Sequence, residues 1–216
     1  NGLSWSSPEI INLASFIPNA LTTNYNLHQS NANEIELSYG KVLSTAGSIN
    51  LNISKSSDNG STWPYGNSIE NFQNKRDAVL LNHSNGNKTV LYVESTPDGN
   101  RIKYSSSTDN GQTWSPAAFF LNSDYDQANP QVIVSPTGIS LVVFEHYLPS
   151  IFNGISQSEI ALVSSSDNGS TWSEVQYLSA YKGNDKFPRL SLINNNVMVS
   201  FFSDRYDSAR HLNNLI

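Results

Sequence analysis

The octapeptide Ser-Thr-Asp-Asn-Gly-Gln-Thr-Trp at residues 107–114 is one of three close copies in this chain. The copies at residues 56–63 and 165–172 both read Ser-Ser-Asp-Asn-Gly-Ser-Thr-Trp, and a shortened copy, Asn-Gly-Leu-Ser-Trp, occupies residues 1–5. A short run in which apolar and polar residues alternate precedes each full copy, as is typical of a β-strand. A motif that recurs every 50 to 60 residues or so indicates an array of similar β units.

The conserved letters of the octapeptide suit a tight turn. Asn and Gly adopt positive φ at low cost, and an Asp carboxylate accepts hydrogen bonds from the backbone of its own turn. The large, flat Trp is suited to packing between neighbouring sheets. We therefore expect the repeated residues to be structural and not catalytic; they are Asp58, Gly60, Trp63, Asp109, Gly111, Trp114, Asp167, Gly169 and Trp172.

The pattern Ser-x-Asp-x-Gly-x-Thr-Trp resembles the Asp box of sialidases, also called the bacterial neuraminidase repeat. The resemblance implies an all-β fold, a β-propeller of four-stranded antiparallel blades. Within a blade the box would join the third and fourth strands, on the rim away from the active-site face. We expect a single domain over residues 1–216 with about four blades, either a closed four-bladed ring or part of a six-bladed one. The approximate units are 6–63, 64–114, 115–172, and 173–216 together with 1–5.

Apolar alternation places the strands within each unit. The third unit shows the plan most clearly. An outer strand at 118–121 is followed by a polar crossing at 122–129 and an inner strand at 131–134. A second strand at 141–145, a long loop at 146–158 and a third strand from residue 160 complete it. Matching strands are expected at 10–13, 34–39, 49–53, 78–81, 89–93, 190–193 and 197–202. Residues 22–29 should form the innermost strand of the first unit, although their alternation is weak.

Composition narrows the class of partner. The chain has 216 residues, a net charge of −6 and no cysteine. An acidic chain is a poor match for nucleic acid or an anionic membrane, and no run approaches the ~18 apolar residues of a spanning helix. We expect a secreted or cell-surface bacterial protein whose partner is a glycan or an extracellular protein.

Alternate loops of a blade fall on opposite faces, and the longer, more varied loops lie on the face opposite the boxes. Function usually gathers on such loops. Glu94, Glu145 and Asp204 take nearly equivalent places in successive units, so one acid per blade could ring the channel. The ligand-binding candidates of this face are Arg76, Asp77, Glu94, Asp126, Glu145, His146, Tyr147, Arg189, Asp204, Arg205 and Tyr206.

The family resemblance implies three arginines on the substrate carboxylate, a tyrosine nucleophile paired with a glutamate, and an acid/base aspartate. Only five arginines occur in the chain, and the family's Arg-Ile-Pro is absent; Phe187-Pro188-Arg189-Leu190 has the order wrong. The sequence thus favours a non-catalytic module that binds a glycan or protein through the face opposite the boxes. The alternatives are an exo-sialidase-type glycoside hydrolase, as part of a catalytic domain, and a structural repeat module.

No cofactor or metal is expected. Calcium is the one ion worth considering, because Asp124-Tyr125-Asp126 and residues 204–207 offer oxygen ligands of the kind it prefers. Neither stretch has the spacing of a known calcium loop. The four histidines are far apart in the sequence and lack the spacing of a zinc site.

Overall fold

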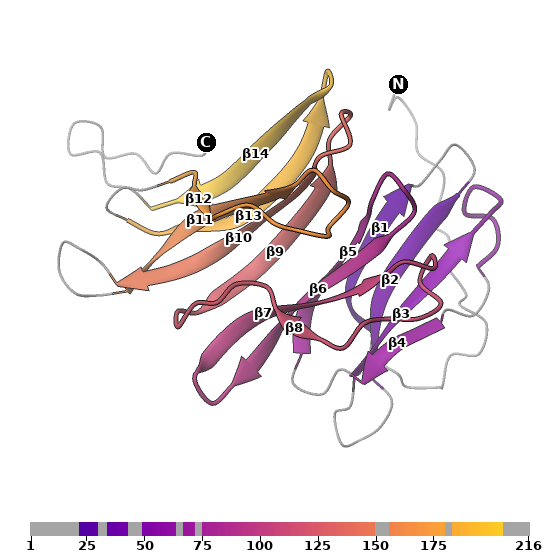
Figure 1. The fold of residues 1–216 in the computed structure, drawn as a ribbon, viewed down its shortest axis with the longest axis horizontal. Coiled ribbons are helices and arrows are strands. Elements are labelled where there is room, and N and C mark those ends of the chain that lie inside the picture. The colour runs from indigo at the N-terminus through magenta and orange to yellow at the C-terminus, as the bar shows by residue number, and fades with distance from the viewer. Residues whose placement is uncertain are drawn as a thin grey trace. The chain divides into compact units, whose positions relative to one another are not determined.

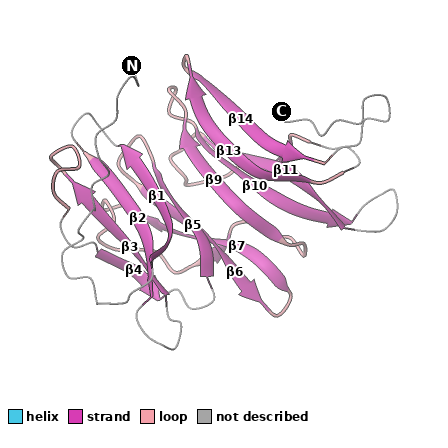
Figure 2. Cartoon of the chain, turned by 180° about the vertical axis from the view of Figure 1, so that it is seen from behind, coloured by secondary structure: helices cyan, strands magenta, loops and turns pink. Residues whose placement is uncertain are grey.

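The sheets formed by the described residues are antiparallel, and neighbouring strands of each sheet follow one another in the chain. The computed structural model describes residues 22–29, 34–42, 49–63, 67–71, 75–149, 156–179 and 183–204. Their regular structure is entirely β (Figure 1, Figure 2). The predicted all-β class and antiparallel sheets are confirmed, and the number of blades stays a prediction. The chain divides into two compact units, Asn1–Asn71 and Phe72–Ile216.

The first unit holds one four-stranded sheet. Its strands are β1 (Thr22–Gln29), β2 (Ile35–Val42), β3 (Ile49–Ser56) and β4 (Asn67–Asn71), in that order. The weakly alternating segment 22–29 is thus confirmed as a strand. Leu37, Tyr39 and Trp63 form a small buried cluster, so the Trp of the first box packs on the second strand of its own sheet. The predicted strand at 10–13 and the box remnant at 1–5 lie outside the described residues.

The second unit contains three sheets. The second sheet consists of β5 (Lys75–Asn82), β6 (Lys88–Thr96), β7 (Gly99–Ser107) and β8 (Ala118–Phe119). The third consists of β9 (Gln127–Val134), β10 (Ser140–Pro149), β11 (Ser156–Ser165) and β12 (Gln176–Tyr177). A two-stranded sheet of β13 (Asp185–Ile193) and β14 (Asn196–Ser203) follows. The inner strand β9 contacts β5 on one side and β13 on the other, so the sheets stack in chain order.

Two predicted boundaries in the third sheet are wrong. The expected loop at 146–158 is largely strand, because β10 and β11 stay paired as far as Pro149 and Ser156. The inner strand begins at Gln127, within the expected crossing. Polar residues at these ends find partners across the sheets: the fully buried Gln127 accepts a 2.8 Å hydrogen bond from the Ile102 backbone. Bonds of this kind extend the strands beyond the apolar alternation.

The main core lies between the second and third sheets. It is built from residues of β5, β6 and β7 in the second sheet and of β10 and β11 in the third, with Phe120 after β8; the set is Val79, Leu81, Leu91, Val93, Ile102, Phe120, Val142, Phe144, Ala161 and Val163. Trp172 of the third box packs against this core, with its ring centroid 5.1 Å from that of Phe120 in an edge-to-face arrangement. The box Trp of the third sheet therefore anchors that sheet to the one before it.

The Ser, Asp and Thr side chains of the three box turns make the same hydrogen bonds. In the second box, Ser107 Oγ donates to Asp109 Oδ1 at 2.7 Å and accepts from the Gly111 backbone at 2.8 Å. Thr113 donates from its backbone and its hydroxyl to the two oxygens of Asp109 at 2.9 and 2.5 Å. Bonds to its threonine lower the pKa of each box Asp to about 2. These bonds close each box into a turn, and the structural role of its residues stays a prediction.

Candidate functional site

A β-bulge recurs near the start of each inner strand in the second unit. The pairing register shifts between Arg76 and Val79 in β5 and between Lys186 and Arg189 in β13. In β9 it shifts opposite the step from Val143 to Glu145 of β10. At each shift one residue takes a positive φ: Asp77 at 54°, Asn129 at 50° and Phe187 at 55°. Bulges redirect side chains and backbone groups locally. All three lie at the end of the sheets opposite the box turns, which we call the loop end.

Glu145 connects three strands at this end. Its Oε1 accepts hydrogen bonds from Asn129 Nδ2 at 2.6 Å and from the Phe187 backbone N–H at 2.7 Å, and its Oε2 accepts from Tyr147 Oη at 2.7 Å. The bulged backbone at Phe187 leaves its N–H free to point across to the neighbouring sheet. With three donors satisfied by one carboxylate, Glu145 is held at 1 % exposure.

Tyr147 is the more accessible member of this pair. Burial, followed by its hydrogen bond to Glu145, raises the pKa of the Tyr147 phenol well above its usual value. Its backbone N–H donates to the Asp126 carbonyl at 2.9 Å. The ammonium of Lys186 lies 5.9 Å from the centroid of the tyrosine ring. Tyr147 thus presents a fixed, protonated phenol beside a cation.

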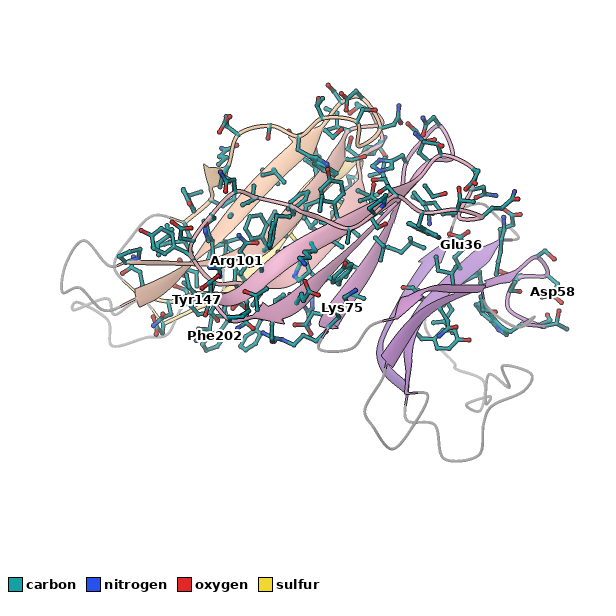
Figure 3. All side chains as sticks on the ribbon, turned by 60° about the horizontal axis from the view of Figure 1, so that its bottom comes forward. Glu36, Asp58, Lys75, Arg101, Tyr147 and Phe202 are labelled. Atoms are coloured by element: carbon teal, nitrogen blue, oxygen red, sulfur yellow. The ribbon has the colours of Figure 1, made fainter. Side chains whose placement is uncertain are left out.

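Arg76 and Asp126 complete the arrangement. Arg76 pairs with Asp77 at 3.3 Å and donates to Asn100 Oδ1 at 3.2 Å. The backbone of Asn100 donates in turn to Asp126 Oδ1 at 2.8 Å. The charges of Asp126 and Arg76 both act on the pKa of Tyr147, in opposite directions. We call Arg76, Asp126, Asn129, Glu145 and Tyr147 the loop-end cluster; Figure 3 labels Tyr147 near Arg101, which pairs with Asp126.

The expected ring of equivalent acids is wrong. In the second sheet, Glu94 lies in register opposite Lys75 of β5 and Arg101 of β7. The residue at the corresponding position of the third sheet is His146, not Glu145. A shift of one residue moves a side chain to the other face of a sheet. Glu94 accordingly forms an ion pair with Lys103 on its own sheet, apart from the loop-end cluster.

His146 faces away from the cluster. Its ring bonds to Ser123 Oγ at 2.8 Å and to Tyr177 Oη at 2.9 Å, and it stacks on the Tyr177 ring at 5.9 Å between centroids. It is 4 % exposed, and burial lowers its pKa to about 4, with a smaller contribution from Arg101. We infer that His146 holds the third sheet together and has no open face toward a ligand.

The remaining described candidates, Asp204 and Arg189, make no hydrogen bond to the loop-end cluster. Asp204 accepts bonds from the backbone and side chain of Asn184, so it fastens the start of β13 to the end of β14. Arg189 is exposed and donates to the Pro188 carbonyl at 3.0 Å, without a bond to the cluster. Arg205 and Tyr206 lie outside the described residues.

Two residues of this end were missed from the sequence. Asn129 is bound to Glu145, and Arg101 is a 5 %-exposed clamp between the second sheet and the following crossing. An Asn before a Pro is a weak signal for a strained position, since Asn tolerates positive φ. Nothing in the local pattern marks Arg101, whose partners come from distant residues.

No group of three or more His, Asp or Glu side chains is placed to hold a metal ion among the described residues. Over the same part of the chain, no helix is long and apolar enough to cross a membrane.

Three solved structures of similar fold place these observations among known proteins. A Dyadobacter fermentans protein of unknown function matches with TM-score 0.64 and 16 % identity, over 85 % of this chain and 62 % of its own. A Hadza microbial sialidase matches with TM-score 0.62 and 14 % identity, over 83 % and 42 %. An α-L-arabinanase of Penicillium chrysogenum, complexed with arabinobiose, matches with TM-score 0.61 and 13 % identity, over 87 % and 58 %.

At these identities the likeness establishes the fold, a sialidase-like β-propeller built of antiparallel sheets. The chain spans about 40 to 60 % of the length of these three structures. No curated protein matches the sequence. The family model described as the BNR repeat-like domain matches residues 1–199, and the chain belongs to that family.

Proposed function

We propose that the protein binds a glycan at the loop-end cluster without hydrolysing it, as a secreted or cell-surface module. Structures of this fold include a sialidase, an arabinanase complexed with arabinobiose and a lyase bound to a sulfated uronate-rhamnose chain. Proteins of this shape thus handle carbohydrates of several kinds. Fold alone does not decide function, so the proposal rests on the side chains of the cluster.

The loop-end cluster offers the groups that sugars need. Tyr147 supplies a ring with a fixed hydroxyl, and Arg76 and Asp126 supply a donor and an acceptor of opposite charge. Their positions are set by strands and bulges, with hydrogen bonds behind each side chain. Preorganised polar groups beside an aromatic ring are typical of carbohydrate sites.

The state of Glu145 and Tyr147 is the observation that carries the non-catalytic proposal. A general base needs an oxygen that can take a proton, but three donors already occupy the Glu145 carboxylate, which is 1 % exposed. The raised pKa of Tyr147 keeps its phenol protonated, which opposes its use as a nucleophile. This pair is better suited to positioning than to bond cleavage.

A sialidase-type hydrolase is the second candidate, and one contact favours it. The 2.7 Å bond between Tyr147 Oη and Glu145 Oε2 joins the two residue types that the sialidase resemblance pairs as nucleophile and base. In that reading, ligand binding would displace Asn129 or Phe187 from the carboxylate and restore its basicity.

A glycan array followed by a fluorogenic sialoside assay separates the two. We expect binding to at least one glycan and no turnover above that of Tyr147→Phe. Tyr147→Phe should weaken binding about threefold to tenfold, through loss of one hydrogen bond. Turnover by the native chain that Tyr147→Phe abolishes would establish the hydrolase, and no binding to any glycan would leave a structural module.

A further inference from the structure

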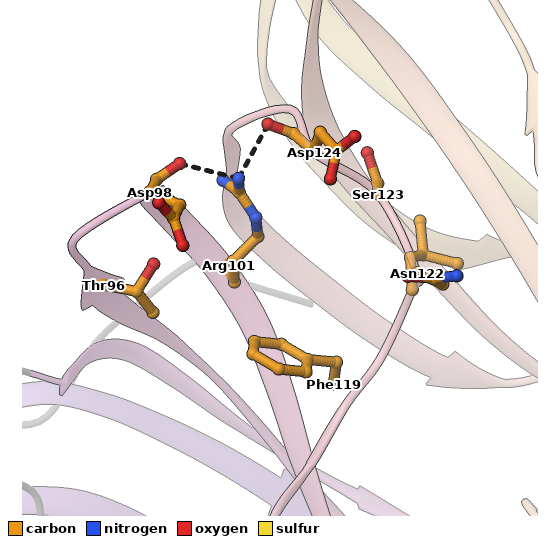
Figure 4. Close-up of a pocket in the computed structure, with 8 residues that line it drawn as sticks. Thr96, Asp98, Arg101, Phe119, Asn122, Ser123 and Asp124 are labelled. Atoms are coloured by element: carbon orange, nitrogen blue, oxygen red, sulfur yellow. Dashed lines mark hydrogen bonds between the residues drawn. The ribbon is translucent and has the colours of Figure 1, made fainter.

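A cavity of about 390 Å³ opens at the loop end of the second sheet, next to the cluster just described, because its lining residue Arg101 pairs with Asp126. It lies between the β6–β7 turn and the segment that follows β8 (Figure 4). Its lining is Thr96, Asp98, Arg101, Phe119, Leu121, Asn122, Ser123 and Asp124, none of them a member of the loop-end cluster. The volume falls within the range of about 300–1,000 Å³ usual for small-molecule sites.

Arg101 fixes the walls of this cavity. Its Nη2 donates to the carbonyls of Asp98 and Asp124, both at 2.7 Å, and so joins the two loops that face each other across the opening. Its Nη1 donates to the Asn100 carbonyl and to Asp126 Oδ1 at 3.1 and 3.3 Å. Both terminal nitrogens of the guanidinium are thereby held by the protein itself, and the walls are set before any ligand arrives.

The groups left for a ligand are an aromatic ring and oxygen acceptors. Phe119 is 56 % exposed, and the structure shows no hydrogen bond to the carboxylates of Asp98 and Asp124 or to the Asn122 amide within the described residues. An open ring packs against the apolar C–H face of a sugar, while carboxylates accept bonds from its hydroxyls. We propose that this cavity binds a neutral sugar, stacked on Phe119 and held by Asp98 and Asp124.

The charge of the cavity sets its specificity. The two cations beside the cavity, Arg101 and Lys103, are paired with Asp126 and Glu94. The carboxylates of Asp98 and Asp124 therefore leave the opening acidic. A sugar that carries a carboxylate or sulfate would be repelled by both groups. The cavity should therefore accept neutral and amino sugars and reject uronates.

The third sheet shows what happens when this position is closed. Tyr177 of β12 corresponds to Phe119 of β8. The residue after each one donates a backbone hydrogen bond to the third strand of its sheet: Phe120 to the Ile102 carbonyl, and Leu178 to the Ile160 carbonyl. The Tyr177 ring is stacked on His146 and its hydroxyl is bonded to that ring. Phe119 has no such stacking partner; it meets the ammonium of Lys103, 4.9 Å from its centroid.

The test titrates the protein with maltose, cellobiose and lactose, and with galacturonate as the charged probe, by ligand-observed NMR and calorimetry. We expect at least one neutral disaccharide to bind and galacturonate not to bind. Phe119→Ala should lower the affinity about tenfold or more, and the double variant Asp98→Asn, Asp124→Asn should also weaken it. Because Phe119 is exposed, the alanine variant should melt at nearly the native temperature.

Phe202→Ala is the matched control, because it removes another exposed phenyl ring, on β14, that does not line the cavity; it should leave the affinity unchanged. Failure of all three disaccharides to bind, or an equal loss in Phe119→Ala and Phe202→Ala, would overturn the inference. A loss confined to Arg76→Ala would place the sugar in the loop-end cluster; that result overturns this inference and leaves the proposed function standing.

Discussion

The two ends of the sheets follow the same repeat in different ways. At the box end, backbone and side chains both recur: Asn59, Asn110 and Asn168 have φ values of 57°, 61° and 58°, and each following Gly is also positive. At the loop end, the bulge recurs at Asp77, Asn129 and Phe187, but the three side chains differ in charge, size and polarity.

This difference shows where the chain has freedom. A turn closed by an Asp carboxylate needs the same Ser, Asp and Thr each time, because these three side chains bond to one another and to the backbone of the turn. A bulge needs only a shift in the backbone register, so its side chains can differ from one sheet to the next. We therefore assign the repeated residues to the structural end, and we propose that the varied residues on repeated geometry form the end that binds a ligand.

The largest expected effect comes from removing the Trp that ties two sheets together. Trp172→Ala should lower the free energy of unfolding by about 3–5 kcal/mol, since it empties the space beside Phe120 at the edge of the main core. Denaturant unfolding measures the change, with the exposed Tyr125→Ala as control. A loss for Trp172→Ala no larger than that of the control would mean that this box does not anchor the sheets.

A smaller effect separates two box glycines. A methyl group at either Gly111 or Gly169 is strained by its positive φ, which costs about 1 kcal/mol or more. At Gly169 the new Cβ would also lie 2.6 Å from the ring of the buried His83, whereas at Gly111 it meets the flexible Lys88 chain at 3.4 Å. The melting temperature of Gly169→Ala should therefore be lower than that of Gly111→Ala. The reverse order would contradict the packing of the third box on His83.

Acid should weaken the box end in a defined pH window. Burial lowers the pKa of His83 to about 4, against 6.5 for an ordinary histidine. Between these values the unfolded chain takes up a proton that the folded chain refuses, so stability falls as the pH drops from about 6.5 to 4. The box aspartates, with pKa values of about 2, add a further loss below about pH 4.

Melting temperatures at pH 7.5 and pH 5 check the histidine contribution. His83→Gln should show a smaller drop between the two pH values than the native chain, although it starts from a lower stability. His146, whose pKa is also about 4, retains part of the dependence in the variant. An identical drop in both proteins would exclude His83 as a source of the lost stability at acid pH.

Local chemistry explains what the sequence could predict. The box turns are closed by contacts within eight residues, so their positions and the flanking strands are readable from the pattern alone. The polar ends of β9 and β11 could not be predicted in this way. The Gln127 side chain bonds to the Ile102 backbone, and the Ser158 backbone bonds to the Asn184 side chain, and both partners are far away in the chain.

The site was predictable only in part. Glu145 and Tyr147 stand out as an acid and an aromatic at a strand end, and the structure brings them together with Arg76 and Asp126. The equivalence of Glu94 and Glu145 failed because one residue of register decides the face of a sheet. The cavity beside Phe119 depends on Arg101 joining two loops, a contact without a sequence signal.

The central claim is that ligand binding and structural bracing occupy opposite ends of the sheets. The direct measurement is the Kd for the best glycan of the array, together with the melting temperature, for Arg76→Ala and Gly111→Ala. We predict that Arg76→Ala raises Kd about tenfold with little change in melting temperature, and that Gly111→Ala lowers the melting temperature with Kd unchanged. A raised Kd in Gly111→Ala and an unchanged Kd in Arg76→Ala would contradict the account.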